Sequence, residues 1–148
     1  DESLTLFKRL ENIALQKAKP LQIKYPNNII VSADTMVTFQ DEMLGKPKNR
    51  EDAKRMLELL SNNKQVVITA VCIIKDQQST TFTDATTVTF KKLSDQEIED
   101  YLDTNEWQGK AGAYAIQGVA SKFVEKIDGD FENVIGMPMY KVIKYLEA

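Results

Sequence analysis

The sequence contains no histidine at all and has one cysteine, Cys72, among its 148 residues. Without histidine the chain cannot supply Ser-His-Asp or Cys-His catalysis. It also cannot build a histidine-based zinc site, and one cysteine does not replace those ligands. A single cysteine excludes a disulfide within the chain, which favours a reducing compartment. Any chemistry must therefore come from carboxylates, lysines, hydroxyls, amides or a hard metal ion.

Long apolar runs and basic patches are also missing. No run approaches the roughly 20 residues that a membrane-spanning helix needs, and no signal-peptide pattern opens the chain. The 19 basic and 22 acidic side chains are interspersed, whereas a protein that binds duplex nucleic acid usually carries a basic patch. The sequence thus predicts a cytoplasmic protein with neither a membrane nor a nucleic-acid partner. The even distribution of charge does not exclude a locally basic pocket that binds a small anion.

The hydrophobic pattern predicts one α/β domain, built on a mixed, twisted sheet that is flanked by helices. The expected helices cover residues 4–18, 50–60 and 95–103, with a last one from Pro138, and the expected strands cover 21–25, 29–39, 66–74, 80–90, 123–127 and 131–135. Pro20 is expected to end the first helix. Residues 49–52 and 94–97 have the composition of helix N-terminal caps.

The stretch from Ile29 to Thr35 is expected to carry the main functional group. It is a short apolar run that is followed by the small residues Ser32 and Ala33 and then by Asp34. We expect Asp34 to lie where the strand leaves the sheet, and the carboxyl ends of strands in open α/β sheets are where ligands bind. The alternative is that Asp34 is a turn residue that caps the strand.

Two lysines stand out by their position. Lys17 extends the apolar stripe of the first helix, although a cation near a helix C-terminus also suits the helix dipole, and its stem can lie over apolar neighbours. Lys46 precedes Pro47, which favours an extended backbone and a fixed direction for the lysine. A plain surface loop is the alternative for Lys46.

Residues 107–118 match neither a helix nor a strand. Three glycines and three alanines among these twelve residues permit a close approach of the backbone. Lys110, Tyr114 and Gln117 are the polar groups of the segment that could bind a ligand. Its Trp, Tyr and Ile content is denser than that of a linker, so the segment is expected to form the wall of a pocket.

Taken together, the unusual polar residues include two carboxylates and three lysines. This combination suits a hard cation and a polyanion, because Mg²⁺ prefers oxygen ligands and lysines neutralise charge on phosphate oxygens. A carboxylate can also deprotonate a water molecule. The full set is Glu2, Lys17, Asp34, Thr35, Lys46, Lys110 and Gln117.

The chain resembles the Maf family of nucleoside triphosphate pyrophosphatases. The resemblance lies in an ordered series of short motifs, namely Ser32-Ala33-Asp34-Thr35, Gly45-Lys46-Pro47, Thr87-Val88-Thr89-Phe90, Lys110 to Gly118, and Gly136-Met137-Pro138. It implies a fold related to the inosine triphosphate pyrophosphatases, and hydrolysis between the α- and β-phosphates with a divalent metal, Mg²⁺ or Mn²⁺. The wording of the Lys110–Gly118 segment is similar to the subgroup that acts on dTTP and UTP, and differs from the subgroup that acts on 7-methyl-GTP and CTP.

The resemblance also implies roles for individual residues. Asp34 matches the general base, and Lys17 and Lys46 match lysines that meet the phosphates, with Lys110 as a further substrate contact. Glu2 matches an acidic residue near the metal, which Asp34 would share. Thr35 and Gln117 match positions that are tied to base selection.

Some features depart from the family pattern. The family normally begins with a strand and a Ser-x-x-Arg-Arg loop, so the resemblance implies that residues 1–148 form one N-terminally incomplete domain. Ser32 and Gln65 stand where the family usually has glycine and histidine.

Two other interpretations of the sequence stay open. One is a nucleotide-binding regulator of septum formation with little turnover, and the other is an α/β domain whose lysines are all solvated. The oligomeric state is also open, with a homodimer among the options.

Overall fold

A computed structural model describes residues 2–40, 42–129, 142–144 and 146. Its elements are, in chain order, α1 (Glu2–Lys24), β1 (Ile30–Phe39), β2 (Glu42–Leu44), α2 (Arg50–Leu60), β3 (Lys64–Lys75), β4 (Gln78–Phe90), α3 (Asp95–Asp103), the short helices η1 (Ala111–Ala113) and η2 (Val119–Phe123), and β5 (Val124–Asp128). The expected strand over 131–135 and the start of the last helix at Pro138 lie outside the described residues.

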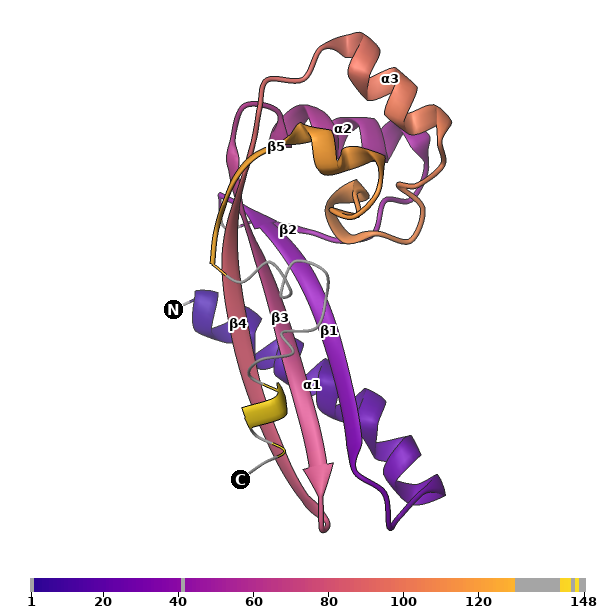
Figure 1. Ribbon diagram of the computed structural model, residues 1–148, viewed down its shortest axis with the longest axis vertical. Coiled ribbons are helices and arrows are strands. Elements are labelled where there is room, and N and C mark those ends of the chain that lie inside the picture. Colours follow the sequence, from indigo (N-terminus) through magenta and orange to yellow (C-terminus); the bar gives the residue numbers. More distant parts are fainter. Residues whose placement is uncertain (1, 41, 130–141, 145, 147–148) are drawn as a thin grey trace.

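The strands form one sheet in the order β2-β1-β3-β4-β5. The long strands β1, β3 and β4 make up the body of the molecule, while α2, α3 and the two short helices gather at one end of it (Figure 1). The α/β class is confirmed, and the apolar run around Val71 is the central strand as predicted. All four described pairings are antiparallel, so the parallel pairing that a mixed sheet requires does not occur among the described strands.

Helix α1 differs most from the prediction. It continues through Pro20 to Lys24, so the expected helix stop and the expected strand over 21–25 are both wrong. The residues that pack on the sheet are Leu10, Ala14 and Ala18, each at most 1% exposed, whereas Ile13 is 40% exposed. This i, i+4, i+8 stripe holds the helix on the sheet. Burial of the stripe outweighs the one backbone hydrogen bond that Pro20 cannot make.

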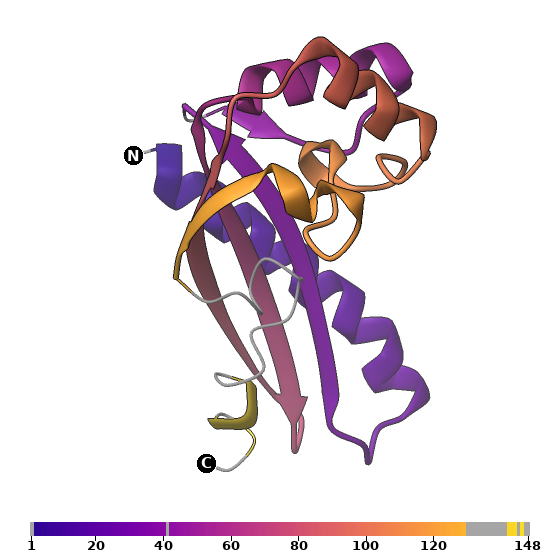
Figure 2. The same ribbon diagram turned by 45° about the horizontal axis from the view of Figure 1, so that its top comes forward.

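The two faces of the sheet are covered differently. Helix α1 lies along one face (Figure 2), where it packs on alternate residues of β1 and β3, including Met36 and Cys72. Burial raises the pKa of the Cys72 thiol, which therefore packs as a small apolar group, as expected. On the opposite face the largest core cluster joins Val37 and Val67 to α2, α3 and the segment that follows α3.

Helices α2 and α3 begin where the sequence predicts. The Asn49 side chain accepts a hydrogen bond from the Asp52 backbone N–H at 2.8 Å. Ser94 and Glu97 form a reciprocal capping box. Both helices pack in one core cluster with Ala113 and Tyr114 of the segment that follows α3. Among the described helices, none combines the length and the apolar character that crossing a membrane requires.

Candidate functional site

A cavity of about 350 Å³ lies between β1 and the segment that follows α3. Its lining contains Ala33, Asp34, Thr35, Val37, Lys46 and Val67 from the sheet and its loops, and Gly109, Lys110, Ala111 and Tyr114 to Gln117 from the segment after α3. The segment over 107–118 is therefore a pocket wall, as predicted. It also brings polar residues from three distant parts of the chain to one place.

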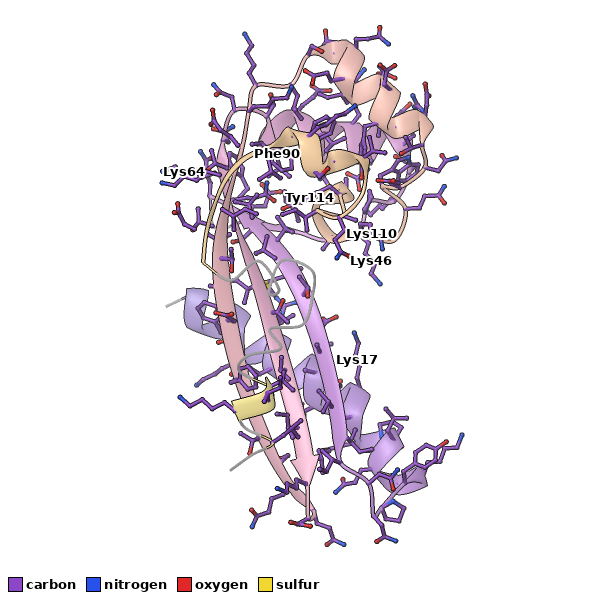
Figure 3. All side chains as sticks on the ribbon, in the orientation of Figure 1. Lys17, Lys46, Lys64, Phe90, Lys110 and Tyr114 are labelled. Carbon is purple, nitrogen blue, oxygen red and sulfur yellow. The ribbon has the colours of Figure 1, made fainter. Side chains whose placement is uncertain are left out.

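The cavity gathers most of the predicted site. Asp34, Thr35, Lys46, Lys110 and Gln117 all line it. Lys17 does not line it but reaches Asp34 from α1. Glu2 begins α1, and its side chain lies outside the described part of the structure. Lys17, Lys46 and Lys110 lie on the β1 side of the sheet (Figure 3), and Lys46 and Lys110 line the same cavity.

Asp34 occupies the middle of β1 rather than its end, so the expected position is wrong. The strand continues to Phe39 because residues 36–38 pair with β3 and residues 37–39 pair with β2. The argument from carboxyl ends of parallel strands does not apply to this antiparallel arrangement. Asp34 is instead accessible because β2 pairs only with the last part of β1, so among the described strands none pairs with the outer edge of β1 at Asp34.

Lys17 and Asp34 form an ion pair. The Lys17 Nζ lies 2.7 Å from the Asp34 Oδ1, and the two side chains are 53% and 27% exposed. Alternation along β1 turns Asp34 toward α1, as it does Ser32, whose hydroxyl donates to the Ala14 carbonyl. The contact fixes the direction of the carboxylate through one of its two oxygens. An exposed pair of this kind adds little to stability, about 0–1 kcal/mol.

Lys46 and Lys110 are brought together by a backbone contact between their neighbours. The Gly112 N–H donates to the Gly45 carbonyl at 3.2 Å, which joins the loop after β2 to the pocket wall. Gly112 has a φ of +70°, and a Cβ there would lie 3.1 Å from a methyl group of Val37. Glycine is therefore required for this close approach. Both lysines are exposed, so their ammonium groups are available to an anion.

The Thr35 side chain points to the cavity side of the sheet, and its hydroxyl is hydrogen-bonded to the neighbouring strand. Its hydroxyl lies 3.0 Å from the hydroxyl of Thr69, the residue directly opposite on β3. Thr69 is fully buried within an otherwise apolar stretch. The pair fixes the direction in which the Thr35 hydroxyl can donate or accept a hydrogen bond.

The aromatic side of the wall is buried and rigid. The Tyr101 hydroxyl donates to the Ala113 carbonyl at 2.8 Å, and the Tyr114 ring packs edge-on against Phe90 with centroids 4.9 Å apart. Burial raises the pKa of both phenols well above the usual range, so both stay protonated at neutral pH. Gln117 is exposed at the end of this rigid wall.

The oxygen donors of the cavity suit a hard cation. Asp34 is the one carboxylate that lines the cavity among the described residues. Mg²⁺ often takes one or two protein carboxylates and completes its shell with phosphate and water oxygens. No group of three or more His, Cys, Asp or Glu side chains in the described part of the chain could hold a metal alone. The donor set therefore fits a cation that is shared with a phosphorylated ligand.

Sequence reasoning missed two residues that support this site. Thr69 could have been noticed as the one hydroxyl in the apolar run from Val66 to Ile74. Glu106, whose carboxylate binds the pocket wall, gave no comparable signal. Both act through contacts with residues that are distant in the sequence.

Comparison of the sequence with known proteins identifies the family to which the chain belongs. A dTTP/UTP pyrophosphatase of Acholeplasma laidlawii is 46% identical over 95% of this chain and 74% of its own length. One from Pyrococcus horikoshii is 47% identical over 90% of this chain and 72% of its own length, and one from Geobacillus is 43% identical over 89% and 71%. The family model described as Maf-like protein matches residues 3–148. The chain therefore belongs to the family of Maf-like proteins.

Proposed function

We propose that this protein hydrolyses dTTP and UTP to the monophosphate and pyrophosphate. The observation that carries the proposal is the cavity, whose lining includes two exposed lysines, a threonine and an amide together with Asp34, whose carboxylate is turned toward Lys17 on α1 at the open edge of β1. The lysines suit a triphosphate chain, and the threonine and amide suit the edge of a base. Relatives that are named dTTP/UTP pyrophosphatases support the same activity.

Asp34 is proposed as the general base. Its carboxylate accepts a proton from the attacking water, whose oxygen forms a bond to the α-phosphorus. The bond from the α-phosphorus to the oxygen that bridges to the β-phosphate breaks, and pyrophosphate leaves with that oxygen. Lys17 holds Asp34 through the 2.7 Å contact. Phosphate oxygens of a bound substrate would compete with Asp34 for the same ammonium group.

Lys46 and Lys110 are proposed to bind the phosphates, because their charges complement oxygens that become more negative in the transition state. Asp34 would hold a divalent cation. The expected role of Glu2 as a second ligand is wrong in this structure, because Glu2 begins α1 and lies about 22 Å along the helix axis from Lys17, which contacts Asp34. When bound, the cation neutralises phosphate charge. Thr35 and Gln117 are proposed to contact the nucleoside.

The products test this proposal directly. With UTP and Mg²⁺, phosphorus-31 NMR should show UMP and pyrophosphate as the first products. Formation of UDP and inorganic phosphate would mean that water attacks the γ-phosphorus, which contradicts the proposed reaction. A protein that leaves UTP and dTTP intact would overturn the proposal as a whole.

Activity should depend on Mg²⁺ or Mn²⁺ and should survive a zinc-selective chelator, because the chain lacks the histidine and cysteine ligands that zinc favours. The measurement is the rate of pyrophosphate release in excess EDTA, followed by restoration with each metal in turn. Full activity in EDTA would be inconsistent with a cation at Asp34.

A further inference from the structure

The turn that carries Gln117 is hydrogen-bonded to the Glu106 side chain. The Val119 backbone N–H donates to the Glu106 Oε2 at 2.9 Å, although the two residues are 13 positions apart. Val119 lies two residues after Gln117, at the start of η2. The turn itself is closed by the Gly118 N–H, which donates to the Ala115 carbonyl at 3.1 Å. A single carboxylate therefore fixes the far side of the turn that presents Gln117 to the cavity.

The Glu106 carboxylate packs directly on this turn at Gly118. A Cβ on Gly118 would lie 2.3 Å from the Glu106 Oε2, closer than any real contact. The φ of Gly118 is −92°, which every residue can adopt. A larger residue at position 118 would therefore displace the Glu106 carboxylate, without any conflict with the backbone conformation.

The backbone of Glu106 is itself anchored to the buried end of α3. Its N–H donates to the Thr104 hydroxyl oxygen at 3.2 Å, and that hydroxyl donates to the Tyr101 carbonyl at 2.6 Å. Tyr101 is 1% exposed. The contacts form a continuous path from the rigid core, through Glu106, to the turn beside Gln117.

We propose that Glu106 is a positioning residue for base discrimination, which holds the Gln117 amide where it can pair with uracil or thymine. This inference rests on the proposed function. Uracil and thymine present acceptor, donor and acceptor groups in a row, and cytosine presents a different edge. A site that hydrogen-bonds one pattern rejects another because its polar groups are then left unpaired, and this rejection requires accurate placement of the amide.

Two substitutions break the same contact in different ways. Glu106→Ala removes the carboxylate. Gly118→Ala keeps the carboxylate but displaces it, because the new Cβ occupies the position of the carboxylate oxygen. The carboxylate is the end of a flexible side chain and can move aside, so the fold should persist. Glu106→Gln retains an acceptor oxygen for the Val119 N–H. Glu58→Ala, on the exposed surface of α2, is the matched control for loss of one negative charge.

The experiment measures the ratio of kcat/KM for UTP to kcat/KM for CTP in each variant. We expect Glu106→Ala and Gly118→Ala each to lower the ratio about 10-fold, and Glu106→Gln and Glu58→Ala to stay near wild type. The double variant of Glu106→Ala and Gly118→Ala should be no worse than either single variant, since both remove one shared contact. An unchanged ratio in Glu106→Ala, or losses that multiply in the double variant, would overturn the inference.

A binding measurement separates this inference from the proposed function. Calorimetry with the α,β-methylene analogues of UTP and CTP reports base selectivity without cleavage. If the wild-type protein selects the uridine analogue but leaves UTP intact, the proposed function fails. Loss of that selectivity in Glu106→Ala would then still support the role of Glu106. Selective binding that persists in Glu106→Ala would overturn it, whatever the turnover.

Discussion

Asp34→Asn is expected to lower kcat for UTP by about 100-fold or more, because an amide cannot accept the proton that a general base removes from water. The substitution keeps the size of the side chain. Asp34 is also partly exposed at the edge of β1, so the melting temperature should change little. The measurements are kcat by pyrophosphate release and the melting temperature by calorimetry.

Asp76→Asn is a matched control for this variant. Asp76 lies in the turn between β3 and β4 with a φ of +51°, which asparagine also tolerates, and it does not line the cavity. The Asp76→Asn variant should retain wild-type turnover. Near-normal turnover in Asp34→Asn would refute the assignment of the base.

Lys17→Met should reduce turnover while the stability stays close to wild type, since the substitution releases the Asp34 carboxylate.

Lys46→Met is expected to weaken binding of UTP by about 10-fold or more, because a hydrogen bond to a charged group contributes roughly 1.5–3 kcal/mol. Methionine keeps most of the length of the stem and removes only the charge. Lys110→Met should behave similarly, because both lysines line the same cavity. Binding of the α,β-methylene analogue of UTP, measured by calorimetry, gives the dissociation constant directly.

Lys92→Met supplies the comparison for these two variants. Lys92 is exposed between β4 and α3 and does not line the cavity, so its loss should leave the affinity unchanged. Equal affinities in Lys46→Met and Lys92→Met would show that Lys46 does not meet the phosphates.

The local features of the fold could be predicted from the sequence, and the longer-range ones could not. The caps at Asn49 and Ser94 depend on contacts over three residues, so the pattern contains them. The end of α1 does not follow from Pro20, because the helix is stabilised by packing of Ala14 and Ala18 on a distant sheet. That packing has no local signature beyond the small size of the two alanines.

The sequence selects several residues that the structure brings to one cavity, but it does not give their geometry. Composition and resemblance select Asp34, Lys46 and Gln117, and the cavity brings them together. The sequence predicts extended backbone through Phe39, but it does not reveal that residues 36–39 pair within the sheet and so leave Asp34 in the middle of β1. It also gives no sign of the Thr35–Thr69 and Glu106–Val119 contacts, since register and loop packing decide both.

The most direct test of the account is a comparison of kcat/KM for UTP, dTTP, CTP, ATP and GTP with the wild-type protein and Mg²⁺. The amide of Gln117 provides both a donor and an acceptor, and it lies in a segment rich in glycine and alanine that a planar base can approach. The account predicts that UTP and dTTP have the highest values, with CTP and both purine nucleotides clearly below them. A highest value for CTP, ATP or GTP would contradict it.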